Sequence, residues 1–296
     1  MIDRLLAPDS LFSRRFFFLA RRFVAGSSIE HAIEAVRGLN AQGMTATLDF
    51  LGEDVRDPQA AIKTRDEYFR MIEAIAGSGV QSNVSVKLTA MGLLLSDDFA
   101  LENLSAILER ARERNPDPFV RIDMEGSPVL EATLRVFERA YARYTNVGPV
   151  LQAYLKRTPD DVTRAIEMGA RVRLCKGAYN EPPAIAYKEM PRIREQYLEC
   201  ARRLLAGGTY PGIATHDRRL IAAVKALAAS EGIAKDRFEF QMLYGVRPNV
   251  QRQIVAEGYR LRIYVPFGTH WAGYFYRRVA ERKENALFAL SSIFSR

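Results

Sequence analysis

Short runs of apolar and β-branched residues recur along most of the chain, and longer stretches with amphipathic helical spacing separate them. Each run has the length of a strand rather than that of a helix. The runs begin near Met44, Asn83, Phe119, Val147, Ala170, Gly212, Phe238 and Arg260. Eight strands that alternate with helices predict an α/β protein with a closed parallel (βα)8 barrel of the TIM type. No Gly-x-Gly-x-x-Gly sequence follows any run, so a Rossmann dinucleotide domain is not indicated.

Residues 1–43 precede the first strand and are expected to form two or three helices packed on the barrel. The second helix, Arg14 to Phe23, combines phenylalanines with arginines, and Ser28 is placed to cap the third. The basic aromatic segment fits a helix on a membrane surface, although such segments more often pack on the barrel or against another subunit. No linker or low-complexity tract follows, so residues 44–296 are predicted to form the barrel, in one domain with residues 1–43.

Side chains within the strands alternate between an apolar and a polar face. In the second strand, Val84 and Val86 oppose Ser85 and Lys87, and the third strand repeats this pattern. The apolar faces are expected to meet the helices, so the polar faces line the barrel interior. This interior set comprises Thr45, Thr47, Asp49, Ser85, Lys87, Thr89, Arg121, Asp123, Glu125, Gln152, Tyr154, Arg171, Arg173, Glu239, Gln241, Arg262 and Tyr264.

So many charges inside a barrel are unusual, because most barrels fill this space with branched apolar side chains. Buried charges are costly unless they are paired, so the interior cations are expected to neutralise the interior carboxylates. The cations are Lys87, Arg121, Arg171, Arg173 and Arg262, and the carboxylates are Asp49, Asp123, Glu125 and Glu239. Each member belongs either to a structural ion network or to a functional site, and those near the C-terminal ends of strands favour function.

After the last strand, Trp271 to Arg282 is predicted to form a final helix over the barrel mouth. Arg277 and Arg278 are adjacent on it, and Glu281 lies three and four residues later, on the same helical face. A guanidinium oriented by Glu281 presents paired N–H donors that match the two oxygens of a carboxylate. The alternative is a solvated Arg–Glu pair on a helix surface. The helix directly follows a strand and a Gly-Thr-His turn, and this position favours the ligand-binding interpretation.

Five separated segments carry a family resemblance. They are Arg173-Leu174-Cys175-Lys176-Gly177-Ala178-Tyr179, Ala214-Thr215-His216-Asp217, Phe238-Glu239-Phe240-Gln241-Met242-Leu243-Tyr244-Gly245, Tyr264-Val265-Pro266-Phe267-Gly268 and Tyr276-Arg277-Arg278-Val279-Ala280-Glu281. In this order the chain resembles the FAD-dependent proline dehydrogenases, from about Thr45 to Glu284, and its compact form is similar to the monofunctional bacterial type. The connection between Gly268 and Arg277 is shorter than in the bifunctional relatives, which affects the shape of the lid over the site.

The resemblance implies a reaction and its partners. L-Proline would be oxidised to Δ1-pyrroline-5-carboxylate by hydride transfer from C5 to N5 of FAD, the first step of proline catabolism to glutamate. Membrane quinone, either ubiquinone or menaquinone, would reoxidise the flavin. The product would pass to pyrroline-5-carboxylate dehydrogenase.

The resemblance also implies roles for individual residues. The catalytic pair would be Asp123 and Arg173, with Arg173 donating toward the N5 region, where negative charge develops. Substrate binding would fall to Lys87, Leu243, Tyr264, Arg277, Arg278 and Glu281. Cofactor binding would fall to Met124, Gln152, Arg173, Cys175, Lys176, Gly177, Thr215 and His216. Glycine at 177 fits close backbone approach to a pyrophosphate, and Lys176 supplies a point charge.

Composition limits the cellular location of the protein and the kinds of site that it can hold. The 296 residues carry a formal net charge of +8, which favours non-specific attraction to anionic surfaces. No apolar run reaches the ~20 residues of a membrane span, and no signal-peptide cleavage pattern is present, so a cytoplasmic protein is expected, with peripheral binding to the inner membrane face left open. Two cysteines without a CxxC pair and three histidines predict neither a disulfide framework nor a metal site.

Two other classes of protein stay open at this point. Lys87 or Lys176, near strand ends, could form a Schiff base, as in barrel aldolases. A basic nucleic-acid-binding module has only the net charge in its favour, since neither a recognition motif nor a basic stripe is present, so no specific nucleic acid is expected.

Overall fold

The computed structural model describes residues 22–114, 117–271 and 274. Eight parallel strands close into a barrel in which each strand pairs with its neighbour in the sequence and β1 pairs with β8. The strands are β1 (Thr45–Phe50), β2 (Ser82–Val86), β3 (Val120–Ile122), β4 (Val147–Gln152), β5 (Arg173–Cys175), β6 (Gly212–Ala214), β7 (Glu239–Leu243) and β8 (Arg260–Phe267). The predicted (βα)8 barrel is confirmed.

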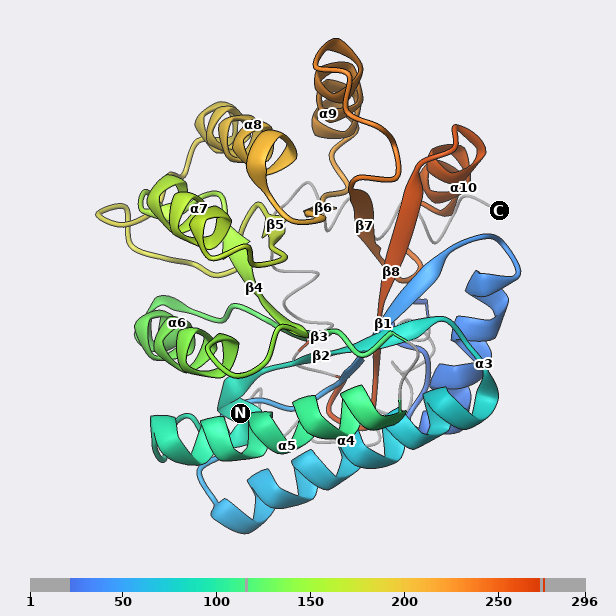
Figure 1. Ribbon diagram of the computed structural model, residues 1–296, viewed down its shortest axis with the longest axis vertical. Coiled ribbons are helices and arrows are strands. Elements are labelled where there is room, and N and C mark those ends of the chain that lie inside the picture. Colours follow the sequence, from blue (N-terminus) through green and yellow to red (C-terminus); the bar gives the residue numbers. More distant parts are fainter. Residues whose placement is uncertain (1–21, 115–116, 272–273, 275–296) are drawn as a thin grey trace, which may run out of the picture.

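Helices surround the strands on the outside (Figure 1). They are α3 (Ile29–Asn40), α4 (Pro58–Ser78), α5 (Asp97–Arg114), α6 (Ser127–Tyr141), α7 (Thr158–Glu167), α8 (Met190–Gly207), α9 (Arg218–Ser230) and α10 (Pro248–Ala256), with a 3-10 turn η1 (Leu88–Met91) after β2. The outward residues Val84, Val86 and Ile122 are fully buried in the core between strands and helices. The period-two alternation therefore identified the faces of these strands correctly.

Helix α3 fills the place between β8 and β1. Ser28 is its N-cap, and the Ser28 side chain accepts a hydrogen bond from the backbone N–H of His31. Its apolar residues Ala32 and Val36 are fully buried, and the helix packs against β1 and β8. The cap predicted at Ser28 is therefore confirmed. The basic aromatic helix predicted at Arg14 to Phe23 lies outside the described residues, except for its last two positions.

The segment before α3 runs along the C-terminal ends of the strands. Ala25 donates its N–H to the carbonyl of Pro266 at 2.9 Å, and Gly268 donates to the carbonyl of Gly26 at 3.0 Å. A small apolar cluster lies beside these bonds and comprises Val24, Leu51, Trp271 and Tyr274. Residues 22–26 thus meet the end of β8 at the barrel mouth. Of the predicted final helix, the structure describes Trp271 and Tyr274.

In the described part of the chain, every helix is too short or too polar to cross a bilayer.

Candidate active site

Asp123 is the centre of the polar side chains at the barrel mouth. It directly follows β3, and its Oδ1 accepts hydrogen bonds from Ser85 Oγ at 2.6 Å and Arg173 Nη1 at 2.8 Å. Its Oδ2 accepts from the hydroxyl of Tyr264 at 2.7 Å, and Lys87 Nζ lies 3.9 Å from the same oxygen. Four strands, β2, β3, β5 and β8, therefore converge on one carboxylate. The residues predicted as the catalytic pair, Asp123 and Arg173, are in direct contact.

Lys87 is held more closely by Asp49 than by Asp123. Its Nζ lies 3.0 and 2.9 Å from the two carboxylate oxygens of Asp49, a residue of β1 that is fully buried. Burial disfavours the charged amine, but the carboxylates of Asp49 and Asp123 outweigh that effect and raise the pKa of Lys87. Lys87 is therefore a protonated cation at neutral pH, and each of its N–H groups is a donor.

A chain of charged and amide side chains continues from Arg173 through the barrel interior. Arg173 Nε donates to Gln241 Oε1, and Gln241 Nε2 donates to Glu239 Oε1 at 2.6 Å. Glu239 Oε1 also accepts from Arg262 Nε at 2.8 Å, and Arg262 Nη2 lies 3.1 Å from Asp117 Oδ2. The predicted mutual neutralisation of interior charges is thus confirmed for Lys87, Arg173 and Arg262.

Arg121 and Arg171 depart from that prediction. Arg121 Nη1 donates to the backbone carbonyls of Pro149, at 3.0 Å, and Arg171. Both guanidiniums lie over the ring of Phe119, with the Cζ of Arg121 4.6 Å and the Cζ of Arg171 4.2 Å from the ring centroid. Neither side chain forms a salt bridge with a carboxylate of the described residues. Main-chain carbonyls contact Arg121 instead, and the aromatic faces of Phe119 and Tyr210 lie against Arg171.

Glu125 was also expected to pair with a cation, but it accepts hydrogen bonds from Thr89. Thr89 Oγ1 donates to Oε2 at 2.6 Å and Thr89 N donates to Oε1 at 3.2 Å. Burial raises the pKa of Glu125 to about 7, against the lowering effects of Thr89 and Lys87. The backbone carbonyl of Glu125 accepts from Gln152 Nε2 at 3.1 Å, so Glu125 connects the ends of β2, β3 and β4.

The predicted cofactor residues at the end of β5 lie against the end of β4. Tyr154 N donates to the carbonyl of Lys176 at 2.8 Å. Gly177 has a φ of +116°, and a Cβ atom at this position would lie 2.2 Å from the Tyr154 ring. Only glycine fits here, because the backbone is in the left-handed half of φ space and already touches an aromatic ring. Lys176 is partly exposed, so its charge is accessible at the mouth.

Thr215 and His216 lie at the end of β6, next to Leu243. His216 Nε2 accepts from the backbone N–H of Leu243 at 2.8 Å, and Thr215 Oγ1 accepts from Asp217 N at 3.1 Å. Asp217 Oδ2 lies 2.7 Å from Arg194 Nε and 3.7 Å from Lys176 Nζ. These contacts bring the predicted cofactor residues of β5 and β6 together, with Leu243 on the substrate side.

Three predicted substrate-binding residues, Arg277, Arg278 and Glu281, lie outside the described residues. The sequence predicted that Asp49 neutralises an interior cation, and it pairs with Lys87. It placed Gln241 in the interior without a role, although Gln241 accepts a hydrogen bond from Arg173. It gave no role to Asp117 or Arg194. The polar alternation of β1 and β7 was the available signal for the first two.

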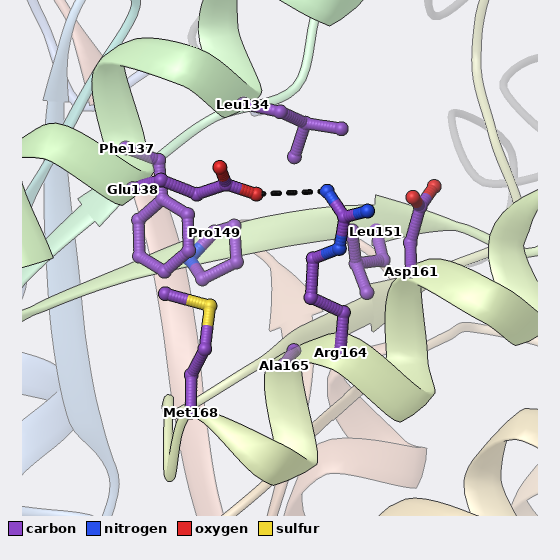
Figure 2. Close-up of a pocket in the computed structure, with 9 residues that line it drawn as sticks. All are labelled: Leu134, Phe137, Glu138, Pro149, Leu151, Asp161, Arg164, Ala165 and Met168. Atoms are coloured by element: carbon purple, nitrogen blue, oxygen red, sulfur yellow. Dashed lines mark hydrogen bonds and ion pairs between the residues drawn. The ribbon is translucent and has the colours of Figure 1, made fainter.

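A crevice lined by apolar and charged side chains lies between α6 and α7 on the outer side of β4 (Figure 2). Arg164 Nη1 and Glu138 Oε1 form an ion pair across it at 3.1 Å. Its lining residues are Leu134, Phe137, Glu138, Pro149, Leu151, Asp161, Arg164, Ala165 and Met168. None of the predicted site residues contributes to it, so the crevice is separate from the candidate active site.

Comparison with known proteins shows the family to which the chain belongs. The family model described as Proline dehydrogenase matches residues 32–290. The chain is 42% identical over 274 residues to Proline dehydrogenase 1 of Bacillus subtilis (strain 168), covering 93% of this chain and 90% of that protein. It is 38% identical over 290 residues to Proline dehydrogenase of Deinococcus radiodurans, covering 96% and 93%.

A solved structure of proline utilization A (PutA) from Bdellovibrio bacteriovorus, inactivated by N-propargylglycine, superimposes with a TM-score of 0.85 at 27% identity. The match covers 92% of this chain and 34% of the PutA chain, so this chain spans about a third of that larger protein. The resemblance and the enzyme class predicted from the motifs are confirmed. The chain belongs to the proline dehydrogenase family.

Proposed function

We propose that this protein oxidises L-proline to Δ1-pyrroline-5-carboxylate with FAD as cofactor, the first step of proline catabolism to glutamate. The observation that carries the proposal is the Asp123 cluster at the barrel mouth. In a chain of this family, Asp123 lies in contact with Arg173 and Tyr264 and 3.9 Å from Lys87. A permanently charged guanidinium, an ammonium and an aromatic ring around one carboxylate suit a small cyclic amino acid better than an apolar ligand.

The carboxylate of proline would be held by Arg277 and Arg278, with Glu281 orienting a guanidinium and Lys87 as a further donor. The contacts of Lys87 support its part. Asp49 engages the ammonium from one side and keeps it charged, and an ammonium has three N–H groups. A cation already paired in this way can accept a second carboxylate without leaving an uncompensated charge when the site is empty.

The pyrrolidine ring would lie against Tyr264 and Leu243. The hydroxyl of Tyr264 is fixed by its bond to Asp123, which sets the orientation of the phenol ring. Leu243 is fixed through its backbone by His216. Apolar side chains are the groups that best recognise an uncharged ring. The hydrogen bond to Asp123 satisfies the Tyr264 hydroxyl, so this polar group is not left without a partner beside the ring.

The residues present fit FAD. When bound, FAD would accept the hydride released from C5 of proline. Arg173, Gln152 and the backbone at Met124 would contact the flavin ring, and Arg173 is already fixed by Asp123 and Gln241. The remaining parts of the dinucleotide would be held by Cys175, Lys176, Gly177, Thr215 and His216. Gly177 allows close backbone approach, and Lys176 supplies an accessible positive charge for phosphate.

We further propose that ubiquinone or menaquinone in the membrane reoxidises the enzyme and that the product passes to pyrroline-5-carboxylate dehydrogenase. The net charge of +8 supports peripheral contact with an anionic membrane surface. Residues 22–26 are bound to the barrel, so a test should remove only residues 1–21. Flotation with anionic vesicles should decrease on this truncation, and undiminished flotation would contradict a membrane role for this segment.

The decisive experiment is anaerobic addition of L-proline to the purified protein while its visible spectrum is followed. A yellow protein whose flavin absorbance is bleached by L-proline is expected. A colourless preparation, or a flavin spectrum unchanged by L-proline, would contradict the proposal. The Schiff-base alternative predicts a colourless protein that borohydride traps with a keto substrate, and the raised pKa of Lys87 argues against it because a Schiff base needs a neutral amine.

A further inference from the structure

The connection from β5 to α8, residues 176–189, is the longest βα connection in the described part of the barrel. Both of its ends are bound to the same short segment after β4. Tyr154 N donates to the carbonyl of Lys176, and Tyr187 N donates to the carbonyl of Tyr154, both at 2.8 Å. Lys156 N donates to the carbonyl of Ile185 at 2.9 Å. The connection therefore has the form of a compact Ω-loop with its base on residues 154–156.

The base of this loop packs on a small apolar cluster. Met124, Tyr154 and Ala186 belong to one buried apolar cluster, separate from the main core. Gln196 of α8 donates from Nε2 to the carbonyls of Ala153 and Leu155, both at 2.6 Å. The base of the loop is thus fixed by packing and by hydrogen bonds.

The tip of the loop is fixed by Glu181. This side chain is 5% exposed, and its Oε1 accepts a hydrogen bond of 2.7 Å from the backbone N–H of Ser127, the first residue of α6. The N-cap of α6 is Gly126, which makes no side-chain cap bond of its own. The first N–H groups of a helix lack partners within it, and its N-terminus attracts negative charge. Glu181 therefore caps α6 from a different loop.

The two segments that Glu181 joins carry different parts of the proposed site. The turn into α6 directly follows Asp123 and Met124, which are a predicted catalytic residue and a predicted flavin neighbour. The Ω-loop begins with Lys176 and Gly177, predicted to hold the rest of the cofactor. Glu181 Oε1 also lies 3.6 Å from the position that a Cβ atom would take on Gly126. Glu181 thus fixes the spacing between the two segments.

We propose that Glu181 is a positioning residue that holds the β5–α8 loop against α6 and thereby strengthens the binding of FAD. The inference rests on the proposed function, because it takes FAD as the ligand between the two segments. Loss of the Glu181 carboxylate frees the loop tip, uncaps α6 and lets the loop move away from the Met124 turn. Glu181 acts through the backbone of both segments rather than by touching substrate.

The test compares three variants of the full chain: Glu181→Ala, Glu181→Gln and Glu189→Ala. Glu189 is the matched control, since it is an exposed carboxylate at the end of the same loop and makes no side-chain cap bond. FAD titration of the apoprotein should show a dissociation constant raised about tenfold or more in Glu181→Ala, the effect of losing one hydrogen bond to a charged group. Glu181→Gln keeps an acceptor oxygen and should show a smaller increase, and Glu189→Ala should match the unaltered protein.

Hydrogen exchange of the loop amides, measured without FAD, gives a second readout. Exchange over residues 176–188 and at the start of α6 should be faster in Glu181→Ala than in Glu189→Ala. Unchanged FAD affinity in a folded Glu181→Ala protein would overturn the inference and leave the proposed function intact. Failure of the unaltered protein to bind FAD would overturn the proposed function, and the cofactor role of Glu181 with it. If Glu181→Ala does not fold, Glu181→Gln decides: FAD affinity equal to that of the unaltered protein would overturn the inference.

Discussion

Asp123 joins four barrel strands through the two oxygens of one side chain. Ser85 of β2 and Arg173 of β5 donate to Oδ1, and the hydroxyl of Tyr264 in β8 donates to Oδ2. A carboxylate with this many donors has a single orientation, and it orients its donors in turn. The proposed substrate and cofactor groups of three strands therefore depend on Asp123.

Replacing Asp123 by Asn tests this dependence. The amide keeps the size of the side chain but is neutral and has one acceptor oxygen, so Arg173 loses its ion pair, and Arg173 and Tyr264 can no longer each donate to an oxygen of their own. We expect kcat/KM for L-proline to fall by about 10- to 100-fold, corresponding to ~1.5 to 3 kcal/mol. Steady-state kinetics would measure the change. Asp98→Asn is the control, because the Asp98 side chain is 83% exposed and pairs with Arg139 on the surface; equal losses in the two variants would argue against the special role of Asp123.

Glu125 gives a prediction about pH and stability. Its pKa is raised by burial to about 7 in the folded protein, from an ordinary value of 4.5. Between these values the folded state binds more protons than the unfolded state, so the free energy of unfolding falls as the pH rises through this window. The contribution is about 3 kcal/mol in all.

Glu125→Gln should remove that dependence. Relative to the unaltered protein, the variant should gain up to about 3 kcal/mol in unfolding free energy between about pH 5 and about pH 8. Urea unfolding at several pH values would measure the difference. Parallel pH profiles for the two proteins would show that Glu125 has an ordinary pKa.

Residue roles were only partly predictable from the sequence. Alternation placed Lys87 in the interior, but its closest partner is Asp49 rather than Asp123. The period of a strand determines which face a side chain occupies, but the stagger between neighbouring strands determines which side chains meet. Arg121 shows a second limit of sequence-based prediction. It donates to backbone carbonyls, and because every residue has one, the sequence pattern does not identify them as partners.

At the scale of elements, one glycine sets the direction in which the β5–α8 loop leaves the barrel. Gly177 starts the loop at a φ of +116° with its α-carbon against the Tyr154 ring. Gly177→Ala should destabilise the fold by roughly 1 to 3 kcal/mol and weaken FAD binding, since the methyl group forces the loop away from Tyr154. Thermal unfolding and FAD titration would measure both effects.

The matched control for this element is Gly77→Ala in α4. A Cβ atom at Gly77 meets nothing within 4 Å, and alanine favours a helix by about 0.5 to 1 kcal/mol over glycine. This variant should be as stable as the unaltered protein or more so. A Gly177→Ala protein that behaved in the same way would contradict the close packing of Gly177 on Tyr154.

The elements themselves were the most predictable part of the structure. Seven of the eight strands begin at or next to the predicted residue, and β5 begins at Arg173, three residues after the predicted Ala170. Apolar runs predict strands well because both faces of a barrel strand are buried. The Ω-loop was not predicted, because its fold depends on the Glu181 and Gln196 contacts with distant segments.

At the scale of the whole molecule, closure of the barrel places Arg262 between β7 and β1. It is 7% exposed, pairs with Glu239 and Asp117, and donates to the carbonyl of Ala46 at 2.8 Å. Burial opposes the charge of Glu239, but Arg262 outweighs it and lowers the pKa of that carboxyl. The pair is therefore charged in the closed barrel.

Arg262→Met should destabilise the protein by about 3 to 5 kcal/mol, because it leaves a buried carboxylate without its cation. The double variant Arg262→Met, Glu239→Gln should lose less than the sum of the two single changes, which a double-mutant cycle in urea would show. The surface pair of Arg114 with Glu73 is the comparison, and Arg114→Met should cost less than about 1 kcal/mol. Additive single changes would indicate that the pair does not couple the strands.

The interior network also determines how a small molecule can reach the proposed site. Below Asp123 the lumen is filled by Arg173, Gln241, Glu239 and Arg262, none more than 7% exposed. Among the described residues these side chains close the barrel axis, so a small molecule would reach the proposed site from the mouth. The proposed product, Δ1-pyrroline-5-carboxylate, would leave by the route that proline enters. Because it keeps the same carboxylate, it should act as a competitive inhibitor of proline oxidation.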